Sequence, residues 1–129
     1  MAHATVICEH KYVAQAISGH HRLICDEPVS NGGSDAGPAP YDLLLASLGA
    51  DTATALRRHA GQQDWTLGKI TVGLRWSSDA SGHEHIERRL SFARPLSAAQ
   101  KAQLLQVAES TPVTSLLRAG ITIQSAILD

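Results

Sequence analysis

The chain has 129 residues, of which 43% are apolar, and its formal net charge is −1 at pH 7. This length and composition allow a single domain, residues 1–129, with a core of its own. A charge near zero, with scattered lysines and arginines, excludes the basic footprint of a nucleic-acid-binding protein and a polybasic membrane surface. No run of about 18 apolar residues and no secretory leader occurs, so we expect a cytoplasmic protein without a membrane partner.

The first part of the chain predicts three short strands, because apolar and polar residues alternate there. The strands cover residues 4–9, 12–18 and 21–26. Cys8 and Cys25 fit inward strand positions, where a free cysteine behaves as a small hydrophobe. Their spacing matches neither a CxxC pair nor a zinc motif, which favours two reduced thiols over a disulfide.

The longest apolar helical segment follows a loop rich in glycine, proline and serine. Pro40 suits the first turn of a helix, because no intrahelical N–H partner is required there. Apolar residues then recur every three or four positions, which predicts a helix from about residue 40 to about residue 62. Gly61 is predicted to close this helix as its left-handed C-terminal residue.

Asp51 is the anomaly of this helix, because it follows Leu48 by three positions and therefore shares the apolar face. A carboxylate in an apolar layer needs a hydrogen bond or a counter-charge, and otherwise its pKa rises. In one interpretation Asp51 lies in a pocket and serves as an acid or base. In the other it caps a second helical segment by accepting from the N–H of Ala53 or Thr54. Arg58, two turns further on, is either a partner for Asp51 or a solvated charge near the helix end.

The middle of the chain predicts an antiparallel hairpin. Apolar and polar residues alternate over residues 65–77, and a turn-forming run follows at residues 79–82. The return strand continues the alternation through Ile86, Arg88, Leu90 and Phe92.

The last part of the chain predicts two helices and a strand. Ser97 and Gln100 have the spacing of a capping box at a helix start. Thr111 and Pro112 suit the N-cap and the first residue of a second, short helix. Isoleucines then alternate from residue 121 to residue 127, which predicts a final strand. The expected order is βββ-α-ββ-αα-β, an α+β arrangement.

Two stretches of this sequence resemble the motifs of the OsmC/Ohr family, the osmotically inducible and organic hydroperoxide resistance proteins. The first is GGSDAGPAPYDLLLASLGAD followed by TATALRRHA, and the second is ESTPVTSLLRAGITI. The order of elements between them agrees as well, so the resemblance covers essentially the whole chain. It implies an OsmC-like fold with antiparallel sheets around a long central helix, in an intertwined homodimer whose sites lie where the subunits meet.

Many members of this family reduce organic hydroperoxides with two cysteines, one on the central helix and one just before the Pro-Val of the second motif. At the matching positions this chain has Asp51 and Thr111. The resemblance therefore marks Asp51 and Thr111 as the catalytic positions, although neither side chain has the sulfur that passes through a sulfenic acid. The pocket around them is expected to include Tyr41, Asp42, Leu48, Thr52, Arg58 and Pro112.

Three functional hypotheses follow. The favoured one is a homodimer that has lost thiol peroxidase activity and binds a small hydrophobic or acyl ligand, or serves a stress-related role. The second is a hydrolytic enzyme with Asp51 as general base or nucleophile and Thr111 or Thr52 close by. The third is a residual hydroperoxide reductase that uses Cys8 or Cys25, although a strand position offers no helix N-terminus to stabilise a thiolate.

The seven histidines do not form a metal-binding motif. His83 and His85 face the same side of a predicted strand, and His20 and His21 lie near a turn, but no third ligand follows at regular spacing. We therefore expect neither a metal nor a cofactor.

Overall fold

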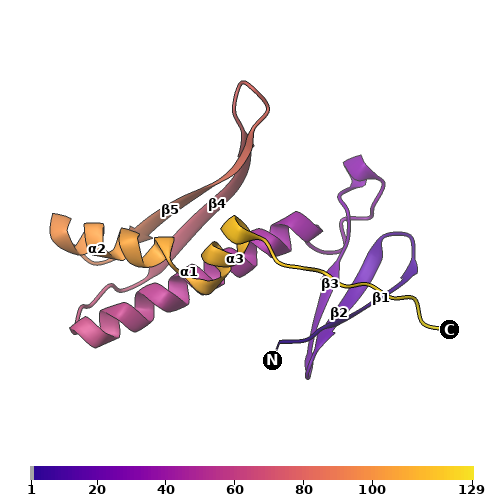
Figure 1. The fold of residues 1–129 in the computed structure, drawn as a ribbon, viewed down its shortest axis with the longest axis horizontal. Coiled ribbons are helices and arrows are strands. Elements are labelled where there is room, and N and C mark those ends of the chain that lie inside the picture. The colour runs from indigo at the N-terminus through magenta and orange to yellow at the C-terminus, as the bar shows by residue number, and fades with distance from the viewer. Residues whose placement is uncertain (1) are drawn as a thin grey trace. The chain divides into compact units, whose positions relative to one another are not determined.

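A computed structural model describes residues 2–129 of the chain (Figure 1). The described residues form two compact units, which divide between Ala46 and Ser47. Antiparallel sheets and helices occur together, so the predicted α+β class is confirmed. None of the helices in residues 2–129 is long and apolar enough to cross a membrane.

The first unit contains a three-stranded antiparallel sheet in the order β1-β2-β3. The strands are β1 (Thr5–His10), β2 (Val13–Ser18) and β3 (His21–Cys25), close to the predicted bounds. Gly19, with a φ of +57°, lies in the tight turn between β2 and β3. A short 3₁₀ helix, η1 (Val29–Asn31), follows the sheet.

The loop between β3 and the central helix is held by Asp26, a residue that the sequence pattern did not single out. Its Oδ1 atom accepts the N–H of Glu27 at 2.8 Å. Its Oδ2 atom accepts the N–H groups of Ser34 and Ala36, each at 3.0 Å. The Asp26 carboxylate therefore holds the N–H groups of residues 27, 34 and 36 close together. Asp26 itself is only 2% exposed.

The central helix α1 (Pro40–Gln63) confirms the predicted helix and runs without a break through Asp51. Its buried face repeats every four residues and consists of Leu48, Thr52, Leu56 and Ala60. A Cβ atom at Gly49 would lie 2.7 Å from Cδ1 of Leu74. Glycine in this helix interior is thus explained by the close approach of α1 to the following strand.

The helix end differs from the prediction. Asp64, with a φ of +56°, adopts the left-handed conformation that was expected at Gly61. The N–H of Trp65 donates to the carbonyl of Ala60 at 2.9 Å, and the N–H of Asp64 donates to the carbonyl of Gly61 at 3.4 Å. This pair of bonds is a Schellman motif, in which an aspartate takes the position that glycine usually fills.

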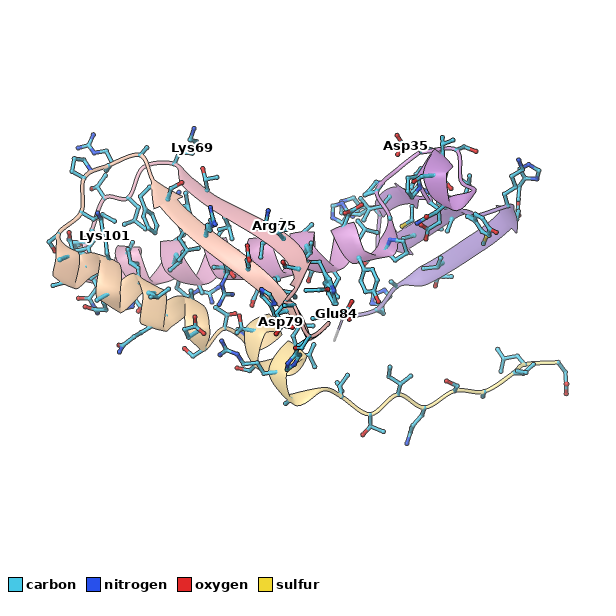
Figure 2. All side chains as sticks on the ribbon, turned by 90° about the horizontal axis from the view of Figure 1, so that it is seen from above. Asp35, Lys69, Arg75, Asp79, Glu84 and Lys101 are labelled. Atoms are coloured by element: carbon cyan, nitrogen blue, oxygen red, sulfur yellow. The ribbon has the colours of Figure 1, made fainter. Side chains whose placement is uncertain are left out.

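The second unit contains the hairpin of β4 (Ile70–Ser78) and β5 (Glu84–Phe92). Figure 2 shows Lys69 at the start of this hairpin and Asp79 and Glu84 at its tip. Arg88 pairs directly with Leu74 across the strands, so it shares the face of the hairpin that carries the alternating apolar residues.

Two helices complete the second unit, α2 (Ala98–Glu109) and α3 (Pro112–Ala119). The capping box of Ser97 and Gln100 is present at the start of α2, as predicted. Thr111 is the N-cap of α3 and Pro112 its first residue, also as predicted.

The core of the second unit joins α1 to α2. Its buried members are Leu56, Ala60, Leu67, Leu104 and Ala108. Half-buried residues of the hairpin and the adjoining segments pack against them, and these are Trp65, Ile70, Leu90, Phe92, Leu96 and Val107.

The predicted final strand is not formed in the single chain. The described residues after α3 have no secondary structure and follow an extended path (Figure 1). Ile121, Ile123 and Ile127 are 72%, 83% and 98% exposed. A strand requires a neighbouring edge for its N–H and C=O groups, and among the described residues the paired strands are β1 to β3 and β4 with β5, without residues 121–127.

Candidate functional site

Asp51 is half-buried on α1 and contacts the start of α3. Its Oδ2 atom accepts the N–H of Val113 at 2.9 Å. Val113 is the second residue of α3, so the carboxylate satisfies one of the free N–H groups at that helix start. The expectation that Asp51 caps a second segment of its own helix is wrong, because α1 is continuous and the carboxylate caps a different helix.

Thr111 caps the same helix from its own first turn. Its Oγ1 atom accepts the N–H of Thr114 at 3.3 Å and lies 2.6 Å from Oγ1 of Thr114. Thr111 is 2% exposed. The structure therefore brings Asp51 and Thr111, the two predicted catalytic positions, to one helix N-terminus, where both are engaged in capping.

Arg88 is the residue at this site that the sequence reasoning missed. Its Nη1 atom donates to Oγ1 of Thr52 at 3.0 Å and to Oγ1 of Thr114 at 2.8 Å. Its Nη2 atom donates to the carbonyl of Ala108 at 2.8 Å. One guanidinium thus joins β5 to the interior of α1, the end of α2 and the first turn of α3.

The hydroxyl groups around Arg88 have a consistent set of donors and acceptors. Thr52 donates to the carbonyl of Leu48 at 2.7 Å and accepts from Arg88. Thr114 donates to the carbonyl of Ala108 at 3.2 Å and accepts from Arg88. Because a threonine has one hydroxyl hydrogen, Thr111 is then the donor in its short contact with Thr114. Each of these hydroxyl hydrogens is used within the network.

The charge of Arg88 is placed where the fold favours a cation. Its side chain is 12% exposed, and the carbonyl of Ala108 belongs to the last turn of α2, the negative end of that helix dipole. Oε1 of Glu109 lies 3.9 Å from Nη2 of Arg88, while Oε2 of Glu109 bonds to Arg118. The hydrogen bond from Arg118 lowers the pKa of the Glu109 carboxyl, and the nearby charges of Arg118 and Arg88 act in the same direction.

A cavity of about 690 Å³ lies beside this network. Its volume is within the range of small-molecule sites, about 300 to 1,000 Å³. Arg88 and Thr114 are part of its wall, and Glu109 and Arg118 lie at the same end. The apolar part of the wall consists of Leu48, Trp76, Ile86, Leu90, Leu105 and Leu117.

The predicted pocket residues of the second unit take different places. Leu48 lines the cavity, and Thr52 is buried behind it as a partner of Arg88. Pro112 is exposed at the start of α3. Arg58 is exposed and has no ion pair within residues 2–129, so it is not the partner of Asp51.

The two remaining predicted pocket residues belong to the first unit. Tyr41 is 64% exposed in the first turn of α1. Oδ2 of Asp42 accepts the N–H of Ala39 at 3.1 Å, so Asp42 caps the start of its own helix.

Cys8 and Cys25 are free thiols in the three-stranded sheet. Both pair with Ala14, Cys8 from β1 and Cys25 from β3, so they are separated by the full width of β2. Two strand spacings amount to about 9.6 Å, which exceeds the Cα separation of about 4.4 to 6.8 Å that a disulfide needs. A bridge between them would require the strands to move.

His85 of the hairpin has a partner on its own strand. Nε2 of His85 lies 3.5 Å from Oε1 of Glu87. Among the residues that the structure describes, no three His, Cys, Asp or Glu side chains come close enough together to hold a metal ion.

Comparison with known proteins identifies the architecture. The family model described as OsmC-like protein matches residues 32–126. No curated protein gives a significant match to the chain.

Several solved structures share the fold at low sequence identity. An OsmC-like protein from Mycoplasma pneumoniae has a TM-score of 0.78 and 18% identity, covering 93% of this chain and 89% of its own. A Psychrobacter arcticus protein proposed to act in osmotic stress and detoxification responses has a TM-score of 0.76 and 20% identity, with coverage of 87% and 85%. The organic hydroperoxide resistance protein OsmC of Legionella pneumophila has a TM-score of 0.66 and 17% identity, with coverage of 92% and 89%.

The family model spans most of the chain, and the matched region contains α1, the hairpin, α2, α3 and the two motifs that carry Asp51 and Thr111. The chain belongs to the family of OsmC-like proteins.

Proposed function

We propose that this protein is a member of the OsmC family without thiol peroxidase activity, and that it binds a small hydrophobic or acyl ligand in the cavity beside Arg88. The observation that carries the proposal is the engagement of Asp51 and Thr111 in capping α3. A solved relative from Legionella pneumophila is an organic hydroperoxide resistance protein, which makes oxidative stress the physiological setting to consider first.

The chemistry of peroxide reduction supports this proposal. A thiolate attacks the peroxide O–O bond, is oxidised to a sulfenic acid and releases an alcohol. A second thiol then condenses with the sulfenic acid to give a disulfide and water, and an external dithiol reduces that disulfide back to two thiols. Neither the carboxylate of Asp51 nor the hydroxyl of Thr111 can undergo that two-electron oxidation. Cys8 and Cys25 are held on separate strands and cannot pair without movement of the sheet.

We rank hydrolysis by Asp51 below ligand binding. A general base must lie within reach of a hydroxyl or water that it can activate. The hydroxyl hydrogens of Thr52, Thr111 and Thr114 are used within the Arg88 network, so none of these three threonines is free for Asp51 to activate.

We propose further that the protein works as a cytoplasmic homodimer in which each chain forms one domain. The apolar side chains exposed on the sheet and at the C-terminus support a partner of the same kind, because a monomer rarely leaves so many uncovered. Two free thiols without a bridge are what a reducing compartment maintains.

A peroxidase assay tests the loss of activity. We expect the purified protein to consume no cumene hydroperoxide with dithiothreitol beyond the buffer rate. The variant Asp51→Cys with Thr111→Cys places thiols at both family positions and should gain thiol-dependent consumption. The measurement is made in a Cys8→Ser, Cys25→Ser background as well as in the native one.

Thiol-dependent turnover by the native chain that disappears in the Cys8→Ser, Cys25→Ser variant would contradict the proposal and establish a peroxidase that uses these two cysteines. Circular dichroism and a cooperative urea transition should accompany each variant, so that an inactive protein is known to be folded.

A further inference from the structure

The guanidinium of Arg88 has donors left over after its network is complete. An arginine has five N–H groups. Both hydrogens of Nη1 and one of Nη2 are used by Thr52, Thr114 and the carbonyl of Ala108. The Nε hydrogen and the second Nη2 hydrogen have no hydrogen-bond acceptor in the part of the chain that the structure describes.

The Nε donor is not sealed inside the protein. No fully buried side-chain nitrogen or oxygen within residues 2–129 lacks a hydrogen-bond partner, so Nε of Arg88 must have some exposed surface. Arg88 lines the 690 Å³ cavity and also a neighbouring cavity of about 670 Å³. Nε and Nη2 together form one edge of the planar guanidinium, the fork that holds both oxygens of a carboxylate.

Glu109 is the nearest carboxylate, but it is held by another residue. Its Oε1 atom remains 3.9 Å from Nη2 of Arg88, beyond hydrogen-bond distance. Arg118 bonds to Oε2 of Glu109 and also donates to the carbonyl of Glu109 at 2.8 Å. Glu109 is therefore hydrogen-bonded to Arg118, whereas its contact with Nη2 of Arg88 is an ion pair without a hydrogen bond, and no carboxylate is hydrogen-bonded to the Nε and Nη2 edge of Arg88 within residues 2–129.

The rest of the cavity wall suits a hydrocarbon chain. Leu48, Leu90 and Leu105 belong to three different elements, α1, β5 and α2, and Leu117 adds a fourth from α3. Glu84, at the tip of the hairpin in Figure 2, lies in the part of the wall contributed by residues 83–86. The wall also contains the charged side chains of Glu84, Glu109 and Arg118. Arg88 is the cation there with hydrogen-bond donors left over, and such a cation beside an apolar lining suits an amphipathic acid.

We infer that the cavity binds an amphipathic monocarboxylate, whose carboxylate oxygens accept from Nε and Nη2 of Arg88 and whose hydrocarbon chain lies along the four leucines. The inference rests on the proposed ligand-binding function and specifies the class of ligand. It differs from any role of Asp51 or Thr111, because neither residue lines the cavity.

The experiment compares decanoate with 1-decanol, which have the same chain and differ in the head group. Isothermal titration calorimetry of the full chain at pH 7.5 should give a dissociation constant about tenfold lower for decanoate, the ratio expected from one charge-assisted hydrogen-bonded pair. In Arg88→Met the preference should disappear, while decanol binding stays within about twofold. Thr52 and Thr114 keep their bonds to the carbonyls of Leu48 and Ala108 in this variant, so it should fold.

Three further variants make the test independent of the folding of Arg88→Met. Arg88→Lys keeps a positive charge but loses the planar fork, so the decanoate preference should fall to an intermediate value. Leu117→Trp reduces the cavity without touching the Arg88 network and should weaken both ligands. Arg94→Met is the matched control. Arg94 lines only the neighbouring cavity of about 670 Å³, which shares Arg88, Leu90 and Leu105 with the proposed site, so a ligand in the proposed site should keep its affinity in this variant.

The outcomes separate this inference from the proposed function. Equal affinity for decanoate and decanol, with both weakened by Leu117→Trp, would overturn the carboxylate assignment and leave small-ligand binding in place. A preference that survives Arg88→Met, or is lost in Arg94→Met, would also overturn it. Absence of binding for both ligands would contradict the ligand-binding proposal itself.

Discussion

A single carboxylate, that of Asp26, organises the loop that precedes the central helix. The N–H of Ala36 contributes most to lowering the pKa of this carboxyl, and the N–H groups of Glu27 and Ser34 act in the same direction against the opposing effect of burial. Gly33 is required next to this cluster, because a Cβ atom there would lie 1.9 Å from the carbonyl oxygen of Glu27. The loop conformation thus depends on the charged form of one residue.

The variant Asp26→Asn should lower the urea midpoint at pH 7, because an amide NH₂ group would replace an oxygen that accepts N–H bonds. Because the pKa of Asp26 in the folded protein lies below the ordinary aspartate value of about 3.9, the ionised carboxylate stabilises the fold above that pH. The stabilisation is lost as the pH falls through the lowered folded pKa. The difference in midpoint between native protein and variant should therefore be full at pH 7 and shrink below about pH 4.

Asp35→Asn is the control for this series, since Asp35 lies on the same loop (Figure 2) and its N–H, rather than its carboxylate, bonds to the carbonyl of Glu27. A midpoint difference for Asp26→Asn that is the same at pH 3 and pH 7 would contradict the role of the charge.

The sequence identified Asp51 as a carboxylate that needs a partner, but not the partner. Val113 lies 62 positions further along the chain, and its N–H is a backbone group that carries no side-chain signal. The position of Arg88 on the buried face of its strand could have been predicted from the sequence. Arg88 follows Ile86 and precedes Leu90 with period-two spacing, so an inward arginine could have been recognised from the same alternation that predicted the strand.

At the scale of one element, α3 is a short helix whose start is stabilised from two sides. Thr111 accepts from the N–H of Thr114, and Asp51 accepts from the N–H of Val113. A helix of 8 residues gains little from propensity alone, so these caps and its tertiary contacts decide whether it forms.

Asp51→Ala should therefore cost about 1 kcal/mol of unfolding free energy, the usual loss for a capping residue, and Asp51→Asn should cost less because it keeps one acceptor oxygen. Hydrogen exchange separates this local effect from a global one. The Val113 amide should lose protection in Asp51→Ala, whereas the Thr114 amide should lose it in Thr111→Ala. Unchanged exchange at Val113 in Asp51→Ala would show that the carboxylate does not cap α3.

The element boundaries show why some predictions succeeded. The starts of α2 and α3 were predictable because Ser97 and Thr111 are local caps with their partners three residues away. The end of α1 was not predictable in this way. Glycine is the residue that favours the left-handed conformation, and Asp64 adopts it because of the backbone hydrogen bonds of the closing turn, which the local sequence does not reveal. The prediction of a final strand was wrong for a different reason. Alternation of apolar and polar residues indicates which side chains share a face of a strand, but not the strand edge with which it pairs.

At the scale of the whole molecule, the described chain leaves apolar side chains uncovered in both units. On the sheet Val6 and Leu23 are 61% and 55% exposed, and at the C-terminus Leu128 is 90% exposed. Side chains of this kind mark surfaces that another chain covers. A single domain and a homodimer both remain predictions, and they are linked, because a second copy would supply the surface against which these residues pack.

The alternating C-terminal residues provide the sharpest test of that dimer. If residues 121–127 pair with an exposed strand edge of a second copy, the N–H of Ile123 or of a neighbouring residue becomes a ladder donor. Ile123→Pro removes an N–H and fixes φ, which an interior strand position tolerates poorly. Ile123→Val keeps the N–H and the branched side chain and is the matched control.

Sedimentation equilibrium should give twice the chain mass of 13.7 kDa for the native protein and for Ile123→Val, and a larger monomer fraction for Ile123→Pro. A native protein that sediments as a monomer would exclude the dimer, and equal dimer content in both variants would show that the C-terminal segment does not build it.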